Sequence, residues 1–171
     1  KDIGSISWYK RYDMALLSFL SRDDLDGAVN NVLCGEEDIS YDGIGSVDGE
    51  LPGEDAAYLR DVMRNKSRLA LLRLMHHEHL TDRDTQTLKT YIREHGKGCD
   101  SEAAWESIRE DFQDDVDAWS SYMEISRPDT ETIKEMLYDL TADKAQLRAF
   151  LISYTAGERK EGGDIFDELM L

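Results

Sequence analysis

Five carboxylates recur every three or four residues between positions 102 and 117, a spacing that would place them on one face of a helix. They are Glu102, Glu106, Glu110, Asp114 and Asp117. Each step along such a helix is about 6 Å, because the rise is about 1.5 Å per residue. Neighbouring carboxylates at this spacing repel each other, so helix stability does not favour the arrangement. The ladder therefore predicts a surface that attracts cationic groups.

Acidic residues are concentrated in two segments of the chain. The 37 residues from Asp23 to Leu59 include 11 Asp or Glu and no Lys or Arg, and Asp100 to Ser126 includes nine, with Arg109 as the sole basic residue. By contrast, Arg60 to Lys97 holds nine basic and five acidic residues. A surface made acidic only for solubility or for high salt would not be segregated in this way. The net charge of −17 therefore predicts a directed field that favours a basic partner.

The spacing of charge can be compared with that of a nucleic acid. One DNA strand places a phosphate about every 3.4 Å, so the ladder alone is about half as dense as one strand. A polyanion surrogate would need the first acidic segment to fold beside the ladder. The residues expected to do so are Glu36, Glu37, Asp38, Asp42, Asp48 and Glu50. We expect both groups to bind a basic, nucleic-acid-binding protein and to bind neither nucleic acid nor membrane directly; inhibition by nucleic-acid mimicry is the sharpest form of this hypothesis.

The segment from Asp38 to Glu50 resembles the start of an EF-hand calcium loop. Oxygen-bearing side chains occupy its first, third and fifth positions, and Gly43 occupies the sixth, where the chain turns sharply around the ion. However, the twelfth position, which should supply a bidentate carboxylate, is Gly49, and Glu50 arrives one residue late. The pattern favours a Gly/Asp-rich turn segment, with a calcium-binding helix-loop-helix protein as a minor alternative.

The spacing of histidine and cysteine bears on zinc binding and on catalysis. His76 and His79 precede a predicted helix, and His95 and Cys99 lie at its opposite end. A helix of 14 residues is about 21 Å long, which separates the two pairs too far for one site. Neither Cys34 nor Cys99 stands in a recognisable nucleophile motif, and there is no Gly-rich phosphate loop. We therefore predict a non-enzymatic protein with no catalytic residue, metal or cofactor.

Helices are expected to carry all of these residues. Apolar periodicity and capping signals predict them at residues 7–20, 21–33, 54–80, 81–96, 100–126, 129–140 and 141–157. Apolar residues surround the helix axis in the segment from Arg68 to Met75, so the helix over 54–80 should be central. Its basic residues, such as Arg64 and Arg73, are expected to turn inward and neutralise acidic elements. An acidic Gly/Asp-rich loop is predicted over residues 35–53.

The chain of 171 residues fits one all-α bundle of about six or seven helices. We expect a helical domain over residues 1–157 and a linker with an amphipathic C-terminal tail over 158–171. With no leader segment and no apolar run of about 18 residues, a cytoplasmic location is expected. The alternative function is a helical adaptor or assembly subunit that uses apolar faces, such as that of Ile165 and Phe166, with acidity serving only solubility. Oligomeric state is left open.

Overall fold

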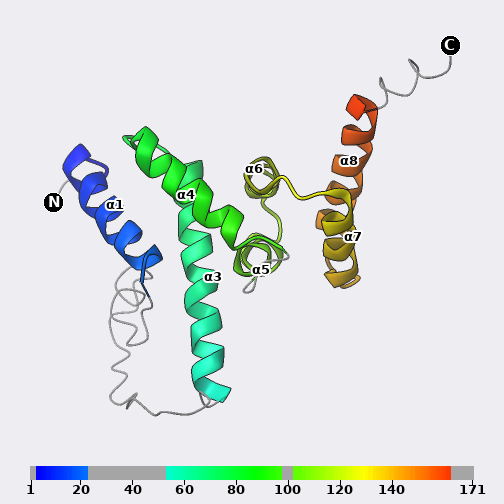
Figure 1. The fold of residues 1–171 in the computed structure, drawn as a ribbon, viewed down its shortest axis with the longest axis horizontal. Coiled ribbons are helices and arrows are strands. Elements are labelled where there is room, and N and C mark those ends of the chain that lie inside the picture. The colour runs from blue at the N-terminus through cyan, green and yellow to red at the C-terminus, as the bar shows by residue number, and fades with distance from the viewer. Residues whose placement is uncertain (1–2, 23–52, 98–101, 163–171) are drawn as a thin grey trace.

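The computed structural model describes residues 3–22, 53–97 and 102–162, which form seven helices and no strand (Figure 1). The helices are α1 (Ile6–Leu20), α3 (Gly53–Met75), α4 (Asp82–Glu94), α5 (Ala103–Glu110), α6 (Val116–Ser126), α7 (Thr130–Asp139) and α8 (Ala145–Gly162). The prediction of an all-α, single-domain fold is confirmed. The helix expected over 21–33 and nearly all of the acidic loop expected over 35–53 lie outside the described residues.

The central helix is α3, as the sequence predicts. It contacts α1, α4, α5 and α6 (Figure 1), and Leu69, Ala70 and Leu71 are all buried. Three consecutive positions of a helix point to different sides, so burying all three requires neighbours on several sides. The helix ends at Met75 rather than at the expected residue 80.

Helix α4 begins at the predicted cap. The side chain of Thr81 accepts a hydrogen bond from the amide of Asp84 at 3.1 Å, which satisfies one of the free amides at the helix start. Leu88, Tyr91 and Ile92 of α4 are buried in the core. The short connection from α3 returns the chain across the C-terminal half of α3, so the two helices pack together (Figure 1).

The prediction of a single helix over residues 100–126 is wrong, because the helix is interrupted between the end of α5 and the start of α6. The side chain of Asp115 accepts a hydrogen bond from the amide of Ala118 at 2.9 Å and caps the start of α6. The carbonyl of Phe112, which would bond to the amide four residues on in a continuous helix, instead accepts from the indole nitrogen of Trp119. Both rings are buried, so the apolar period continues across the break.

Helices α7 and α8 pack together beside α5 and α6 (Figure 1). Asp129 caps α7 by accepting from the amide of Thr132 at 2.8 Å, at the start of the helix predicted over 129–140. The rings of Trp119 and Phe150 lie 5.5 Å apart and join α6 to α8. Helix α8 begins later than expected and continues through Gly157, its predicted end, to Gly162. The proposed division at residue 157 stays a prediction.

None of the helices in the described ranges combines the length and the apolar character needed to cross a membrane.

Candidate partner-binding surface

The three predicted carboxylates at α5 all have basic neighbours. Glu102, which immediately precedes α5, lies 3.2 Å from the ammonium of Lys97, and Glu106 lies 3.8 Å from the guanidinium of Arg64. Glu110, the last residue of α5, pairs with Arg109 at 3.0 Å and with Lys144 at 3.5 Å. These pairs reduce the charge that α5 offers to a partner.

Further along the chain, from residue 114 to residue 117, three carboxylates are not neutralised. Asp114 and Asp117 are exposed, and Asp115 is half-buried as the cap of α6. Within the part of the chain that the structure describes, no basic side chain forms a salt bridge with any of the three. We call residues 110–117 the acidic turn. It holds five Asp or Glu and no Lys or Arg in eight residues. Glu110 and Asp111 have basic partners, so its unpaired charge is that of Asp114, Asp115 and Asp117.

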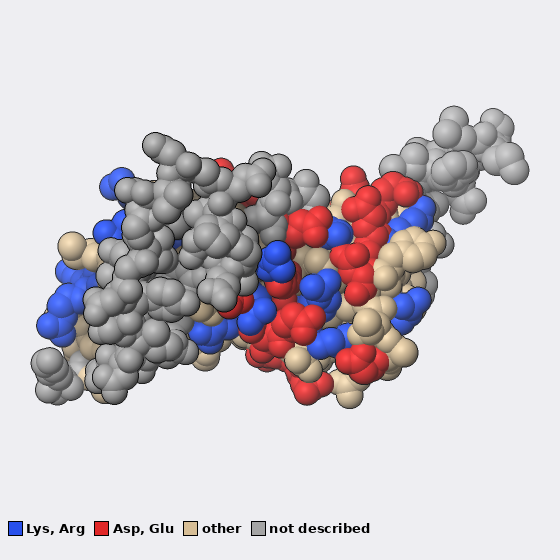
Figure 2. All heavy atoms as spheres, turned by 90° about the horizontal axis from the view of Figure 1, so that it is seen from below, with Lys and Arg blue, Asp and Glu red and all other residues tan. Residues whose placement is uncertain are grey.

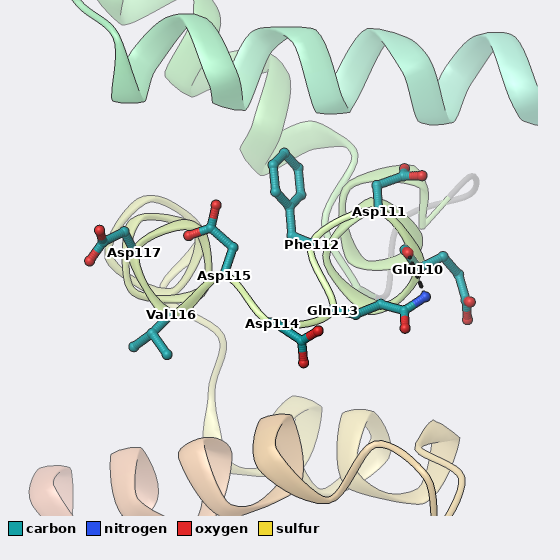
Figure 3. Close-up of a pocket in the computed structure, with 8 residues that line it drawn as sticks. All are labelled: Glu110, Asp111, Phe112, Gln113, Asp114, Asp115, Val116 and Asp117. Atoms are coloured by element: carbon teal, nitrogen blue, oxygen red, sulfur yellow. Dashed lines mark hydrogen bonds between the residues drawn. The ribbon is translucent and has the colours of Figure 1, made fainter.

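The acidic turn lines a broad surface hollow of about 700 Å³ (Figure 3). Asp111 and Phe112 extend toward α3, whereas Asp114 and Val116 point to the opposite side, toward α7 and α8. The side chain of Val116 stands between two carboxylates and is 53% exposed. The hollow therefore combines negative charge with a small apolar contact, which suits the long aliphatic stem and charged head of Lys or Arg.

Asp111 has a different role from the other carboxylates of the turn. Burial raises the pKa of its carboxyl group, and the positive charges of Arg64 and Arg68 offset that rise only in part. Its Oδ2 lies 3.3 Å from Nε of Arg64. Asp111 therefore anchors the turn to α3, while Asp114 and Asp117 remain directed to solvent.

Seen from below, carboxylates gather over the middle and one side of the molecule, with basic side chains among them (Figure 2). The mixture agrees with the pairing of α5 to cations from α3, from the chain before α5 and from Lys144, which immediately precedes α8. The remaining predicted site residues lie outside the described part of the chain; they are Glu36, Glu37, Asp38, Asp42, Asp48 and Glu50. Whether they extend the acidic turn therefore stays a prediction, as does calcium binding by the EF-hand-like segment.

The inward role predicted for basic residues of α3 is confirmed at two positions. Arg64 pairs with carboxylates of α5 and of the acidic turn. Arg73 is buried and pairs with Asp13 of α1 at 2.6 Å. Its guanidinium also donates to the backbone carbonyls of His76 and Glu78, which follow the end of α3.

Two of the four histidines have structural partners for their side chains. His95 stacks on Tyr91, with ring centroids 4.0 Å apart, and its Nδ1 lies 2.8 Å from the backbone carbonyl of the same residue. His79 contacts the ring of Tyr9 at 5.5 Å. Among the described residues, no three His, Cys, Asp or Glu side chains converge on a point that could hold a metal ion.

Sequence reasoning missed two members of the acidic turn, Asp111 and Asp115. Both fall off the helical stripe that singled out the other five carboxylates, so the assumption of one continuous helix hid them. Asp115 could have been found from its residue type. Asp is a preferred N-cap residue, because its side chain can accept a hydrogen bond from the amide three residues later.

Comparison with known proteins adds no relative: no family model, curated protein or solved structure matches the chain.

Proposed function

We propose that the protein is a non-enzymatic interaction protein whose acidic turn binds a basic surface of a partner protein. The observation that carries this proposal is the cluster of Asp114, Asp115 and Asp117 beside a surface hollow, without salt bridges to described basic side chains. Unpaired carboxylates at this density repel each other, and a cationic partner would relieve that repulsion. The partner best suited to such a field is a nucleic-acid-binding protein, because its own surface is basic.

Inhibition by mimicry of nucleic acid is a narrower form of the same proposal. The break after α5 interrupts the ladder, and cations already neutralise Glu102, Glu106 and Glu110. The acidic turn alone is too short to imitate several successive phosphates, which follow each other about every 3.4 Å on one strand. Mimicry therefore requires the acidic residues between Glu36 and Glu50 to extend the charge. Binding of a basic partner does not require them.

The test is the binding of purified basic nucleic-acid-binding proteins at low and high salt. The double variant Asp114→Asn with Asp117→Asn removes two charges with almost no change of shape. A matched control, Glu78→Gln with Glu94→Gln, removes two exposed charges near the ends of α4. We expect high salt and the first variant to weaken binding strongly, and the control to weaken it little. Binding that ignores salt, or that falls equally in both variants, would rule out recognition by the acidic turn.

A second candidate is a helical adaptor that assembles through apolar contacts. It is favoured by the exposed apolar side chains of α1, where Met14 is 73% and Ile6 is 55% exposed. Association through this face would depend little on salt, because screening acts on charges. Replacing Met14 by Ser would weaken such an assembly and would leave binding through the acidic turn unchanged.

A further inference from the structure

In contrast to the acidic turn, a second pocket of the protein is lined by more basic than acidic side chains. It lies between α4 and α6 and is closed at one side by the chain that joins α3 to α4. Its volume is about 520 Å³, within the range of about 300–1,000 Å³ that is usual for small-molecule sites. None of the carboxylates of the acidic turn lines it. It is therefore a separate feature from the proposed partner-binding surface.

Three basic side chains line this cationic pocket. Lys89 and Arg93 are four residues apart on α4, so they project from the same face of the helix, and Arg127 follows α6 on the other side. Two carboxylates, Asp82 and Glu124, also line the pocket. Cations thus outnumber carboxylates locally, although the whole chain carries a net charge of −17.

Hydrogen bonds fix the side chain of one of these cations and the backbone of another. Nε of Arg93 donates a hydrogen bond to the carbonyl of Ile125 at 2.9 Å, which fixes its guanidinium near the end of α6. Arg127 has a left-handed backbone, with φ of 45°, and its amide donates to the carbonyl of Met123. That conformation is unfavourable for a residue with a side chain, and strained positions of this kind gather at ligand sites.

The pocket also contains apolar surface. Leu74 and Leu80 contribute from the end of α3 and from the chain that follows it, and Ile125 contributes from α6. A ligand that satisfies both parts of the wall must join a negative group to an apolar body. Inorganic ions satisfy only the charged part, and hydrocarbons satisfy only the apolar part.

We propose that this pocket binds a small organic phosphate whose body is apolar. A phosphate monoester carries about −1.5 to −2 charge near neutral pH and has three acceptor oxygens. Guanidinium groups bind such oxygens in pairs, and a lysine ammonium adds a compact charge. Lys89 and Arg93 of α4 and Arg127, which follows α6, supply these donors, while the leucines and Ile125 receive the body. This inference does not depend on the function proposed for the acidic turn.

The test uses phenyl phosphate as the probe and follows backbone amide shifts of the full chain by NMR. We expect saturable shifts confined to residues lining the cationic pocket. Inorganic phosphate and benzoate should each bind about tenfold or more weakly, a difference of about 1.4 kcal/mol. Equal binding of benzoate would overturn the assignment to a phosphate. Equal binding of inorganic phosphate would overturn the role of the apolar wall, and shifts that do not saturate would overturn the site.

Variants separate this pocket from general attraction of anions. Lys89→Gln with Arg127→Gln should weaken phenyl phosphate binding by at least tenfold, while circular dichroism shows that the protein remains folded. The matched control is Arg83→Gln, because Arg83 also lies on α4 but faces the groove between α1 and α4. If the control weakens binding as much as Lys89→Gln or Arg127→Gln alone, the pocket is not the site. If the double variant fails to fold, Lys89→Gln alone decides, and unchanged affinity in it would overturn the proposal.

Discussion

Arg73 and Asp13 form a buried ion pair that joins the end of α3 to the middle of α1. Nε of Arg73 lies 2.6 Å from Oδ1 of Asp13, and Nη2 lies 3.2 Å from Oδ2. The two side chains are 3% and 10% exposed. Arg73 also lies over the ring of Tyr9, at 4.7 Å from the ring centroid. The guanidinium of Arg73 thus binds both the chain that follows α3 and the side chain of Asp13, which attaches α1 to the core.

Removing one member of this pair should destabilise the protein strongly. Asp13→Ala leaves the guanidinium of Arg73 buried without its counter-charge, and we expect a loss of about 3 kcal/mol in the free energy of unfolding. Urea denaturation measures this loss. Glu131→Gln is the control, because it removes an exposed pair of 2.6 Å with Lys134 and should cost less than about 0.5 kcal/mol. Similar losses in the two variants would show that the buried pair does not join α1 to the core.

Lys97 and Asp139 connect the chain before α5 to the end of α7, and this contact should give stability a dependence on pH. Burial alone would raise the pKa of Asp139, but the hydrogen bond and charge of Lys97, 2.7 Å away, outweigh it and hold the pKa below its ordinary value. A carboxyl group with a lowered pKa in the folded state contributes stability above its unfolded pKa of about 4. That contribution is lost as the pH falls through the folded pKa.

Asp139→Asn should therefore lower stability by about 1 kcal/mol at neutral pH and reduce the loss of stability below about pH 4. The measurement is thermal or urea unfolding across the acid range. Asp114→Asn is the control, since no described cation pairs with it, and its acid unfolding should follow that of the unaltered chain. A curve for Asp139→Asn that falls as steeply below pH 4 as the unaltered chain would contradict the role of this pair.

Asp115 should matter for folding, and Asp114 should not. Asp115→Ala removes the cap of α6 and should cost about 1 kcal/mol in unfolding free energy. Asp115→Asn retains an oxygen that can accept from the amide of Ala118, so most of the stability should remain. Asp114→Asn should change stability by less than about 0.5 kcal/mol. Chemical denaturation of the three variants distinguishes these roles, and an equal loss for Asp114→Asn would assign it a structural function.

The sequence was sufficient to predict helices whose ends are determined by contacts between residues close together in the chain. Thr81 with Asp84 marks the start of α4, and Asp129 marks the start of α7, because each cap is a contact across three residues. The position of α3 in the centre also followed from its apolar residues. These features depend on helix geometry alone, so neighbouring residues in the chain contain the necessary information.

Features that depend on distant contacts could not be predicted. Arg64 of α3 pairs with Glu106, and Lys144, which immediately precedes α8, pairs with Glu110; both cations are far from these carboxylates in the chain, and no spacing in the sequence pairs them. The break between α5 and α6 was hidden for a related reason. Phe112 and Trp119 are seven residues apart and both face the core, so the apolar period is the same with or without a break. Only the tertiary structure shows whether the helix continues or is interrupted.

The hydrogen bond from the indole nitrogen of Trp119 to the carbonyl of Phe112 should stabilise the interruption between α5 and α6. Trp119→Phe keeps an aromatic ring in the core but removes the indole N–H that donates to the carbonyl of Phe112. That carbonyl would keep the longer hydrogen bond from the amide of Asp115, at 3.4 Å. A buried acceptor that loses its partner costs about 1–3 kcal/mol, so unfolding free energy should fall within that range. Trp8→Phe makes the same chemical change at a half-buried site on α1 and should cost less. Hydrogen exchange of the amides of residues 112–118 should rise in Trp119→Phe and stay unchanged in Trp8→Phe. Unchanged exchange in both variants would mean that the cap at Asp115 maintains the break by itself.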